Sequence, residues 1–177
     1  MKKKRVPHGA VLLVILTALA LWGCGSDKNL NPEADLIYRG ADPSTANVGV
    51  NPPLNHLAYF LFDVKLNDPN LSMVGSDAWT VDRVEKHYLL VSDPGGHLSA
   101  LPEDDTQKLK IKVSPGNTAR VPVNIVSDTY LLEKAQDFVG TSDTARLKLR
   151  LTFHAHRNKD GAPKVVQASY FFNIGNY

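Results

Sequence analysis

Two histidines that lie two residues apart on a predicted strand are the clearest candidates for metal chemistry. His154 and His156 belong to the segment 146–156, in which apolar and polar residues alternate. Side chains at i and i+2 of a strand point to the same side, so the two imidazoles would emerge about 7 Å apart. The chain offers three further histidines as a third ligand: His56, His87 and His97. Together they could hold a transition metal; the alternative is two solvated polar side chains.

Basic side chains line the polar faces of two predicted strands, 108–113 and 146–156. They are Lys108, Lys110, Lys112, Arg146, Lys148 and Arg150. If the two strands are adjacent, they create one positive sheet face that could meet anionic lipid headgroups, acidic glycans or an acidic protein. The alternative is an ordinary solvated face whose charge keeps sheets from associating with one another.

The remaining polar clusters carry weaker signals for chemistry. Glu103, Asp104 and Asp105 could contribute carboxylates to calcium, but the glycine and the spaced ligands of a calcium loop are missing. The sequence also contains no G-x-S-x-G elbow, phosphate-cradling glycine loop or H-E-x-x-H motif. We therefore expect a protein that is not an enzyme, with a hydrolase of no recognised motif as an alternative.

The N-terminal segment has the layout of an export signal. Four basic residues at 2–5 precede an apolar run at 10–20, and the only cysteine follows at position 24. A helix over 11–23 would be roughly 20 Å long, shorter than the roughly 30 Å hydrocarbon core of a bilayer. The pattern therefore predicts a signal peptide rather than a membrane-spanning helix.

The four residues Leu21-Trp22-Gly23-Cys24 resemble the lipobox of bacterial lipoproteins. Leu21, Gly23 and Cys24 match that motif, whereas Trp22 departs from its usual small or β-branched residue. The resemblance implies recognition of Leu21 and Gly23 by the signal peptidase, cleavage before Cys24, and a covalent diacylglycerol and N-acyl lipid on Cys24. No other cofactor is expected. Gly25, rather than an aspartate, follows the cysteine, which in Gram-negative lipoproteins implies the outer membrane.

Removal of residues 1–23 changes what the composition implies. The excess of basic residues in the whole sequence lies in the leader, so residues 24–177 carry sixteen basic and eighteen acidic side chains, a net charge of −2. This mildly acidic balance argues against nucleic acid as a partner. The lipidated cysteine leaves no thiol for a disulfide, a thiolate zinc site or haem attachment.

We predict three segments. Residues 1–23 form the removed signal peptide, 24–35 the lipidated cysteine and a flexible tether, and 36–177 one β domain. Six to eight strands separated by turns with proline and glycine predict a mainly β fold, specifically a single antiparallel β-sandwich. One short helix is expected near 129–139, where apolar residues have helical spacing. The strand rhythm resembles immunoglobulin-like and fibronectin type III-like domains.

Several local features extend this prediction. Residues 40–53 are rich in turn formers and are expected to form an irregular crossing loop, whereas 55–66 should be a central strand covered on both faces. Pro122 should lie in an edge strand, because it cannot donate a ladder hydrogen bond. Phe171 alternates with the inner residues of the last strand, so it should point outward, where it and Tyr177 could form an exposed apolar spot.

These observations favour a lipid-anchored protein of the bacterial cell envelope, which acts as a binding or structural module in a larger assembly. Its partners would be the membrane, through the lipid, and envelope proteins or glycans. A metal-handling envelope protein that uses His154 and His156 is the alternative of a different class.

Overall fold

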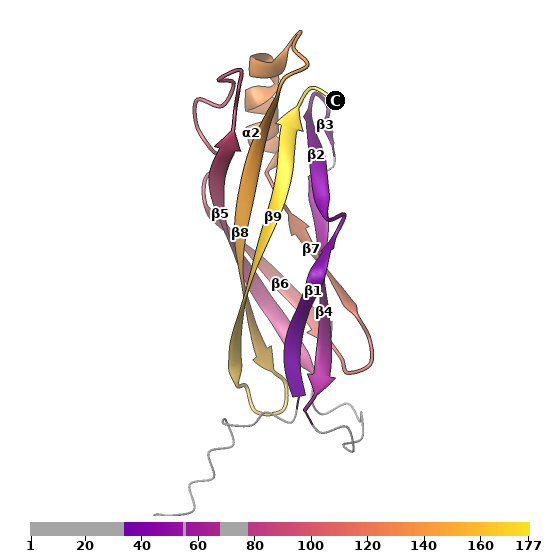
Figure 1. Ribbon diagram of the computed structural model, residues 1–177. Helices are drawn as coiled ribbons and strands as arrows, with labels where there is room; N and C mark the ends of the chain where they lie inside the picture. The colour runs from indigo at the N-terminus through magenta and orange to yellow at the C-terminus, as the bar shows by residue number, and fades with distance from the viewer. Residues whose placement is uncertain (1–33, 55, 68–77) are drawn as a thin grey trace, which may run out of the picture. The chain divides into compact units, whose positions relative to one another are not determined.

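The computed structural model describes residues 34–54, 56–67 and 78–177 (Figure 1). The expected signal peptide, Cys24 and residues 24–33 of the tether lie outside these ranges. In chain order the strands and helices are β1 (Ala34–Asp42), β2 (Thr45–Val50), β3 (Pro53–Leu54), β4 (Leu57–Leu66), β5 (Trp79–Ser92), β6 (Asp105–Val113), β7 (Ala119–Asn124), α2 (Asp128–Lys134), the 3₁₀ helix η1 (Ala135–Phe138), β8 (Thr144–Arg157) and β9 (Pro163–Gly175). Because β1 begins at Ala34, the β domain starts two residues before the expected position.

The strands form two sheets. One has three strands in the order β1-β4-β7, and the other has six in the order β3-β2-β9-β8-β5-β6. The mainly β prediction is confirmed. An antiparallel arrangement throughout is not, because β2 pairs in parallel with β9 and makes the larger sheet mixed.

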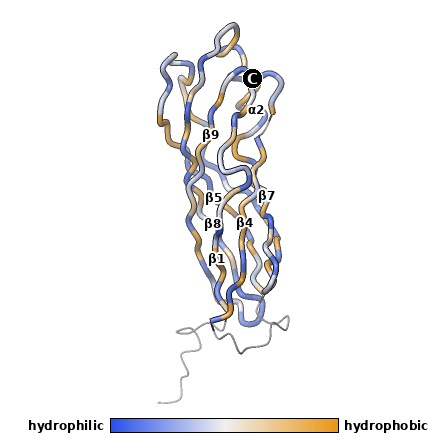
Figure 2. The backbone as a smooth tube through the Cα atoms, turned by 45° about the vertical axis from the view of Figure 1, so that its right-hand side comes forward, coloured by the Kyte–Doolittle hydropathy of each residue, from blue (hydrophilic) through white to orange (hydrophobic). Residues whose placement is uncertain are grey.

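The core lies between the two sheets. Phe60 of β4 meets the ring of Phe153 of β8 at 5.3 Å between centroids and that of Tyr170 of β9 at 5.6 Å. Hydrophobic and hydrophilic residues alternate along the strands (Figure 2), because successive side chains of a strand point to opposite faces. The large aromatic side chains of Trp79, Tyr88, Tyr170 and Phe172 are all buried.

The hairpin of β8 and β9 is the longest pairing in the larger sheet, and the alternation in 146–156 followed by the turn residues 158–161 already indicates it in the sequence. The strands pair from Thr144 opposite Gly175 to His156 opposite Pro163. Gly161 closes the turn with φ of 72°, a left-handed conformation that glycine adopts without steric cost. The odd-numbered residues of β8 therefore face the core, and its even-numbered basic residues and histidines face outward.

A β-bulge in β5 changes which residues face the core. The register shifts between Val81 and Arg83 on both sides of the strand. Trp79 and Val81 are buried before the bulge, whereas Val84, Lys86 and Tyr88 are buried after it. Because of the extra residue, the buried side chains in 79–91 occupy odd positions before the bulge and even positions after it. The same shift turns Lys86 toward the core.

Residues 40–53 differ from the expected irregular loop. β1 continues to Asp42, and β2 then pairs with β9 over Thr45–Gly49. Ala46, Val48 and Val50 are buried and stand at every second position, as in a strand. The turn-forming residues around them made this alternation hard to recognise in the sequence. β4 is the central strand of its sheet, as predicted, but only its even-numbered face is buried.

The chain passes between the sheets after β6. β6 is an edge strand of the larger sheet, whereas β7 is an edge strand of the smaller one. The two therefore do not form a hairpin, although alternating residues stand on both sides of the turn residues 114–117 in the sequence. Pro122 does lie in an edge strand, as expected, opposite Tyr59 of β4.

The predicted helix is confirmed. Ser127 caps it, with its side-chain oxygen accepting a hydrogen bond from the backbone N–H of Tyr130. Leu131 and Phe138 are buried, and Gly140 follows η1 in a left-handed conformation.

Candidate functional site: the outer face of the six-stranded sheet

The basic residues singled out in the sequence lie on one face, the outer face of the six-stranded sheet. Cross-strand register places His154 of β8 opposite Arg83 of β5, which in turn lies opposite Lys108 of β6. The condition for one continuous positive face, adjacency of the two strands, is not met, because β5 lies between β6 and β8. The face therefore has two separate basic rows: Lys108, Lys110 and Lys112 at the β6 edge, and Arg146, Lys148 and Arg150 on the central strand β8.

β5 brings acidic side chains between these rows, and they engage both histidines of β8. Nδ1 of His156 lies 2.7 Å from a carboxylate oxygen of Asp82, and Nε2 of His154 lies 2.9 Å from one of Glu85. Arg83 contacts the other ring nitrogen of His154 at 3.3 Å. The imidazoles thus emerge on the same face, as predicted, but each already has a carboxylate partner.

The three candidate third ligands lie apart from His154 and His156. His56, His87 and His97 instead pair with Asp128, Asp104 and Asp143. Within residues 34–54, 56–67 and 78–177, no three His, Cys, Asp or Glu side chains are grouped to hold a metal ion. The metal hypothesis therefore gains no third ligand from the described structure and stays a prediction.

Arg146, Lys148 and Arg150, hereafter the β8 basic row, differ from the histidines in having no acidic partner. In the described part of the chain, no carboxylate forms an ion pair with any of the three. Phe171 of β9 lies opposite Lys148, with Lys148 Nζ 5.6 Å and Arg146 Cζ 5.3 Å from its ring centroid. The ring attracts both cations by a cation–π interaction without neutralising them.

Phe171 thus points outward, as the alternation predicted. Its neighbours are cations rather than an apolar side chain. Phe171 was expected to offer an exposed apolar contact, but it instead packs against side chains of the β8 basic row. Tyr177, the other residue of the expected apolar spot, lies beyond the end of β9 and is 47% exposed.

A pocket of about 680 Å³ opens beside the β8 basic row. Six side chains of β5, β8 and β9 line it in two cross-strand rows: Ser169, Arg150 and His87 in one, and Gln167, Thr152 and Glu85 in the other. The pocket also contacts the beginning of β6 through Asp105 and Thr106. Its volume lies within the range of about 300–1,000 Å³ typical of small-molecule sites.

Asp104 orients the imidazole of His87 at one end of this pocket. Its Oδ2 lies 2.5 Å from Nδ1 of His87, and its Oδ1 accepts a hydrogen bond of 3.1 Å from the backbone N–H of Tyr88. The hydrogen bond with His87, followed by that with Tyr88, lowers the pKa of the Asp104 carboxyl below its ordinary value. Asp104, considered above for calcium, therefore acts as a hydrogen-bond acceptor for its own chain.

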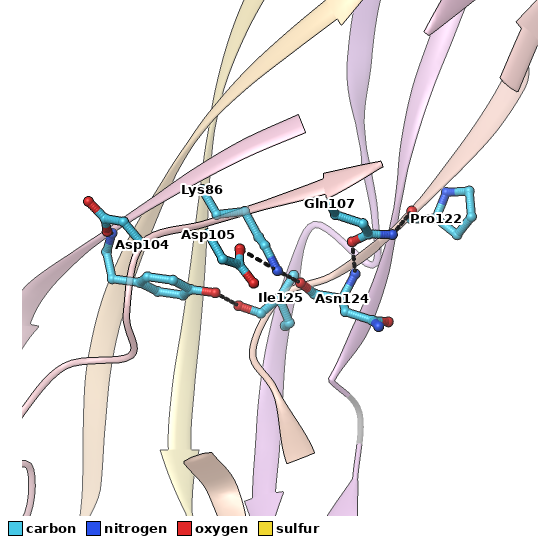
Figure 3. Close-up of polar contacts among 8 residues, drawn as sticks. Lys86, Asp104, Asp105, Gln107, Pro122, Asn124 and Ile125 are labelled. Atoms are coloured by element: carbon cyan, nitrogen blue, oxygen red, sulfur yellow. Dashed lines mark hydrogen bonds and ion pairs between the residues drawn. The ribbon is translucent and has the colours of Figure 1, made fainter. Parts of the chain in front are cut away.

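Two residues of the pocket lining, Lys86 and Asp105, belong to a group of polar contacts between the sheets (Figure 3). Nζ of Lys86 lies 2.9 Å from a carboxylate oxygen of Asp105 and donates a hydrogen bond of 2.9 Å to the carbonyl of Asn124. Tyr88 donates to the carbonyl of Ile125 at 2.9 Å, and burial is the main reason that the pKa of this tyrosine is raised. These contacts join β5 and β6 of the larger sheet to the end of β7.

Sequence patterns singled out Arg150, His87, Asp104 and Asp105, but for three separate roles and not as one site, and they did not single out the remaining side chains of the pocket. Ser169, Gln167 and Thr152 alternate with core residues, which assigns them to the outer face. Their grouping with His87 and Glu85 depended on the order β9-β8-β5, which alternation within single strands does not specify.

No match was found for this chain among protein-family models, curated proteins or solved structures. Among the described residues, no helix combines the length and apolar character needed to cross a membrane. The geometry of the outer face is therefore the basis for a functional interpretation.

Proposed function

We propose that this chain is a lipid-anchored protein of a bacterial cell envelope, whose β domain is a non-catalytic binding or structural module. The observation that supports a binding role is the β8 basic row. Its three cations share one face and lack an acidic partner in the described part of the chain, and one of them, Arg150, lines a pocket. Elsewhere on this face, His154 and His156 are paired with carboxylates. Lys108, Lys110 and Lys112 lie at the β6 edge and do not line the pocket, which favours the β8 basic row as the place for an anionic partner.

The anchor rests on the N-terminal sequence. Residues 1–23 provide the signal peptide, and Cys24 receives the lipid after cleavage at the motif that includes Leu21 and Gly23. At about 0.8 kcal/mol per buried methylene, two or three acyl chains hold a protein at the bilayer almost permanently. In a Gram-negative organism, Gly25 after the cysteine favours the outer membrane.

We also propose an immunoglobulin-like fold for the β domain. The strand orders β1-β4-β7 and β9-β8-β5-β6 correspond to the orders A-B-E and G-F-C-C′ of immunoglobulin-type sandwiches. The buried Trp79 at the start of β5 occupies the strand that carries the characteristic tryptophan of such domains. In this assignment β2 is an additional strand at the β9 edge.

A binding role fits the pocket better than hydrolysis does. Ser169, His87 and Asp104 could suggest a nucleophile, a base and an orienting acid, but β8 lies between Ser169 and His87. Two strand spacings amount to about 9.6 Å, whereas a nucleophile and its base need hydrogen-bond contact. Arg150 occupies the position between them.

The anchor is tested with the variant Cys24→Ser in bacterial cells that are fed a labelled fatty acid. We expect the wild-type chain to incorporate the label and to sediment with membranes, and the variant to do neither. A wild-type chain without covalent lipid would contradict the anchor.

The binding surface is tested by cross-linking in intact cells. Replacement of all three residues of the β8 basic row by glutamine should remove the cross-linked envelope partner. The matched control replaces Lys108, Lys110 and Lys112 by glutamine; it removes the same charge from the same face and should retain the partner. Retention of the partner by both variants would refute a role for the β8 basic row.

A further inference from the structure

We infer that the pocket between β5, β8 and β9 binds a sugar residue that carries one carboxylate, such as a uronic acid of an envelope glycan. This inference rests on the proposed function, because it assigns a ligand class to the same binding surface. It depends on three properties of the pocket: one cation with no ion-pair partner among the described residues, acidic side chains that already have partners, and a lining rich in hydroxyl and amide groups.

Arg150 is the cation. It lies on the central strand β8, between Ser169 of β9 and His87 of β5, and no described carboxylate pairs with it. The planar guanidinium of arginine binds a carboxylate through two parallel hydrogen bonds, which specify the orientation of the ligand as well as its charge. A carboxylated ligand would thus be fixed at the middle of the pocket.

The acidic side chains that line the pocket are already engaged. Glu85 contacts His154 at 2.9 Å and Arg83 at 3.5 Å. Asp104 pairs with His87, and Asp105 with the buried Lys86. Their negative charge still opposes a polyanion, so nucleic acid, polysulfated glycans and dianionic phosphate suit the pocket less well than a single carboxylate does.

The rest of the lining matches a ligand with several hydroxyl groups. Thr106, Thr152 and Ser169 present hydroxyls, and Gln167 presents an amide. These groups both donate and accept hydrogen bonds, as a sugar hydroxyl does, and the engaged carboxylates retain lone pairs that can accept from such hydroxyls. An acidic peptide segment would offer its carboxylates without the matching hydroxyls.

The test is a titration of the full-length protein in detergent, monitored through backbone amide signals. The probes are glucuronate, glucose, inorganic phosphate and a short polyglutamate peptide. We expect glucuronate to shift the signals of Ser169, Arg150 and His87. Glucose should bind about ten-fold or more weakly, because it lacks the charged hydrogen bonds to the guanidinium. Equal binding of phosphate, polyglutamate or glucose would overturn the inference.

Two variants separate recognition of the sugar from a general attraction to anions. Arg150→Gln should weaken glucuronate binding at least ten-fold, and Gln167→Leu should weaken it while the charge of the face is unchanged. The control Lys110→Gln removes one positive charge from the β6 edge and should leave binding as it is. A loss with Lys110→Gln as large as that with Arg150→Gln would overturn the inference.

Failure of this inference is distinguishable from failure of the proposed function. If glucuronate does not bind but substitution of the β8 basic row still removes the cross-linked partner, the ligand class is wrong and the binding surface stands. If the cross-linked partner also survives that substitution, both are wrong.

Discussion

Lys86 is a buried cation whose partners come from both sides of the core. It is 5% exposed, and its Nζ contacts Asp105 of β6 and the carbonyl of Asn124 of β7. A buried ammonium is costly unless its donors are satisfied, and Lys86 meets this condition by joining the two sheets.

We predict that Lys86→Ala destabilises the fold by about 2–3 kcal/mol, because it leaves the carbonyl of Asn124 without its donor and creates a cavity. Urea unfolding monitored by tryptophan fluorescence measures this change. The control Lys112→Ala, an exposed lysine on β6, should change the free energy of unfolding by less than about 0.5 kcal/mol. Equal effects of the two variants would show that the contacts of Lys86 add nothing to stability.

Asp160 produces a predictable dependence of stability on pH. Its carboxylate pairs with the buried Arg157, with Nε of that residue 2.9 Å from Oδ1, and this contact lowers the aspartate pKa to about 2. The unfolded chain binds this proton at higher pH than the folded chain does. The stabilisation is therefore fully present above pH 4 and is lost as the pH falls toward 2.

The variant Asp160→Asn should accordingly show a flatter loss of stability between pH 4 and pH 2 than the wild-type chain. Urea midpoints measured across that range test this expectation. Glu133→Gln, an exposed acid on α2, serves as a control and should reproduce the wild-type slope. The prediction is wrong if the Asn variant does so as well.

At the level of strands, the side chain of Gln107 links β6 to β7, which do not pair through their backbones. β6 and β7 are consecutive but belong to different sheets. The side-chain amide of Gln107 donates to the carbonyl of Pro122 at 3.2 Å, and its oxygen accepts from the N–H of Asn124 at 3.0 Å. One side chain therefore satisfies a backbone carbonyl and a backbone N–H at the edge of β7. Pro122 itself has no backbone N–H to donate.

We predict that Gln107→Ala costs about 1–2 kcal/mol of stability, since it removes both hydrogen bonds. Hydrogen exchange should also show faster exchange of the Asn124 amide. Lys108→Ala, at the neighbouring outward position, should leave that exchange rate unchanged. A protected Asn124 amide in the Gln107 variant would contradict this role.

For the whole domain, aromatic contacts between the sheets form part of the apolar core. Phe60 of β4 is fully buried and reaches both Phe153 and Tyr170 of the opposite sheet. Burial also raises the pKa of Tyr170 to about 12, so its hydroxyl remains protonated at neutral pH. Because residues 24–177 contain no cysteine beyond Cys24, stability depends on this packing rather than on disulfides.

Phe60→Ala should therefore destabilise the domain by about 3–5 kcal/mol, the usual cost of removing a buried phenylalanine. Denaturant unfolding provides the measurement. Leu57→Ala, on the same strand but 37% exposed, should cost less than about 1 kcal/mol. A small effect of Phe60→Ala would mean that the two sheets do not depend on each other for stability.

The sequence by itself determined the mainly β class, the position of the short helix, the β8–β9 hairpin and the outward direction of Phe171. These features follow from local periodicity, from turn residues such as Gly161 and from capping, all of which act over a few residues. The tertiary structure decided which strands are neighbours. It placed β5 between the two basic rows, assigned β6 and β7 to different sheets, and brought Ser169, Arg150 and His87 into one pocket. Alternation shows which face of a strand is polar, but the order of strands depends on contacts between residues distant in the chain.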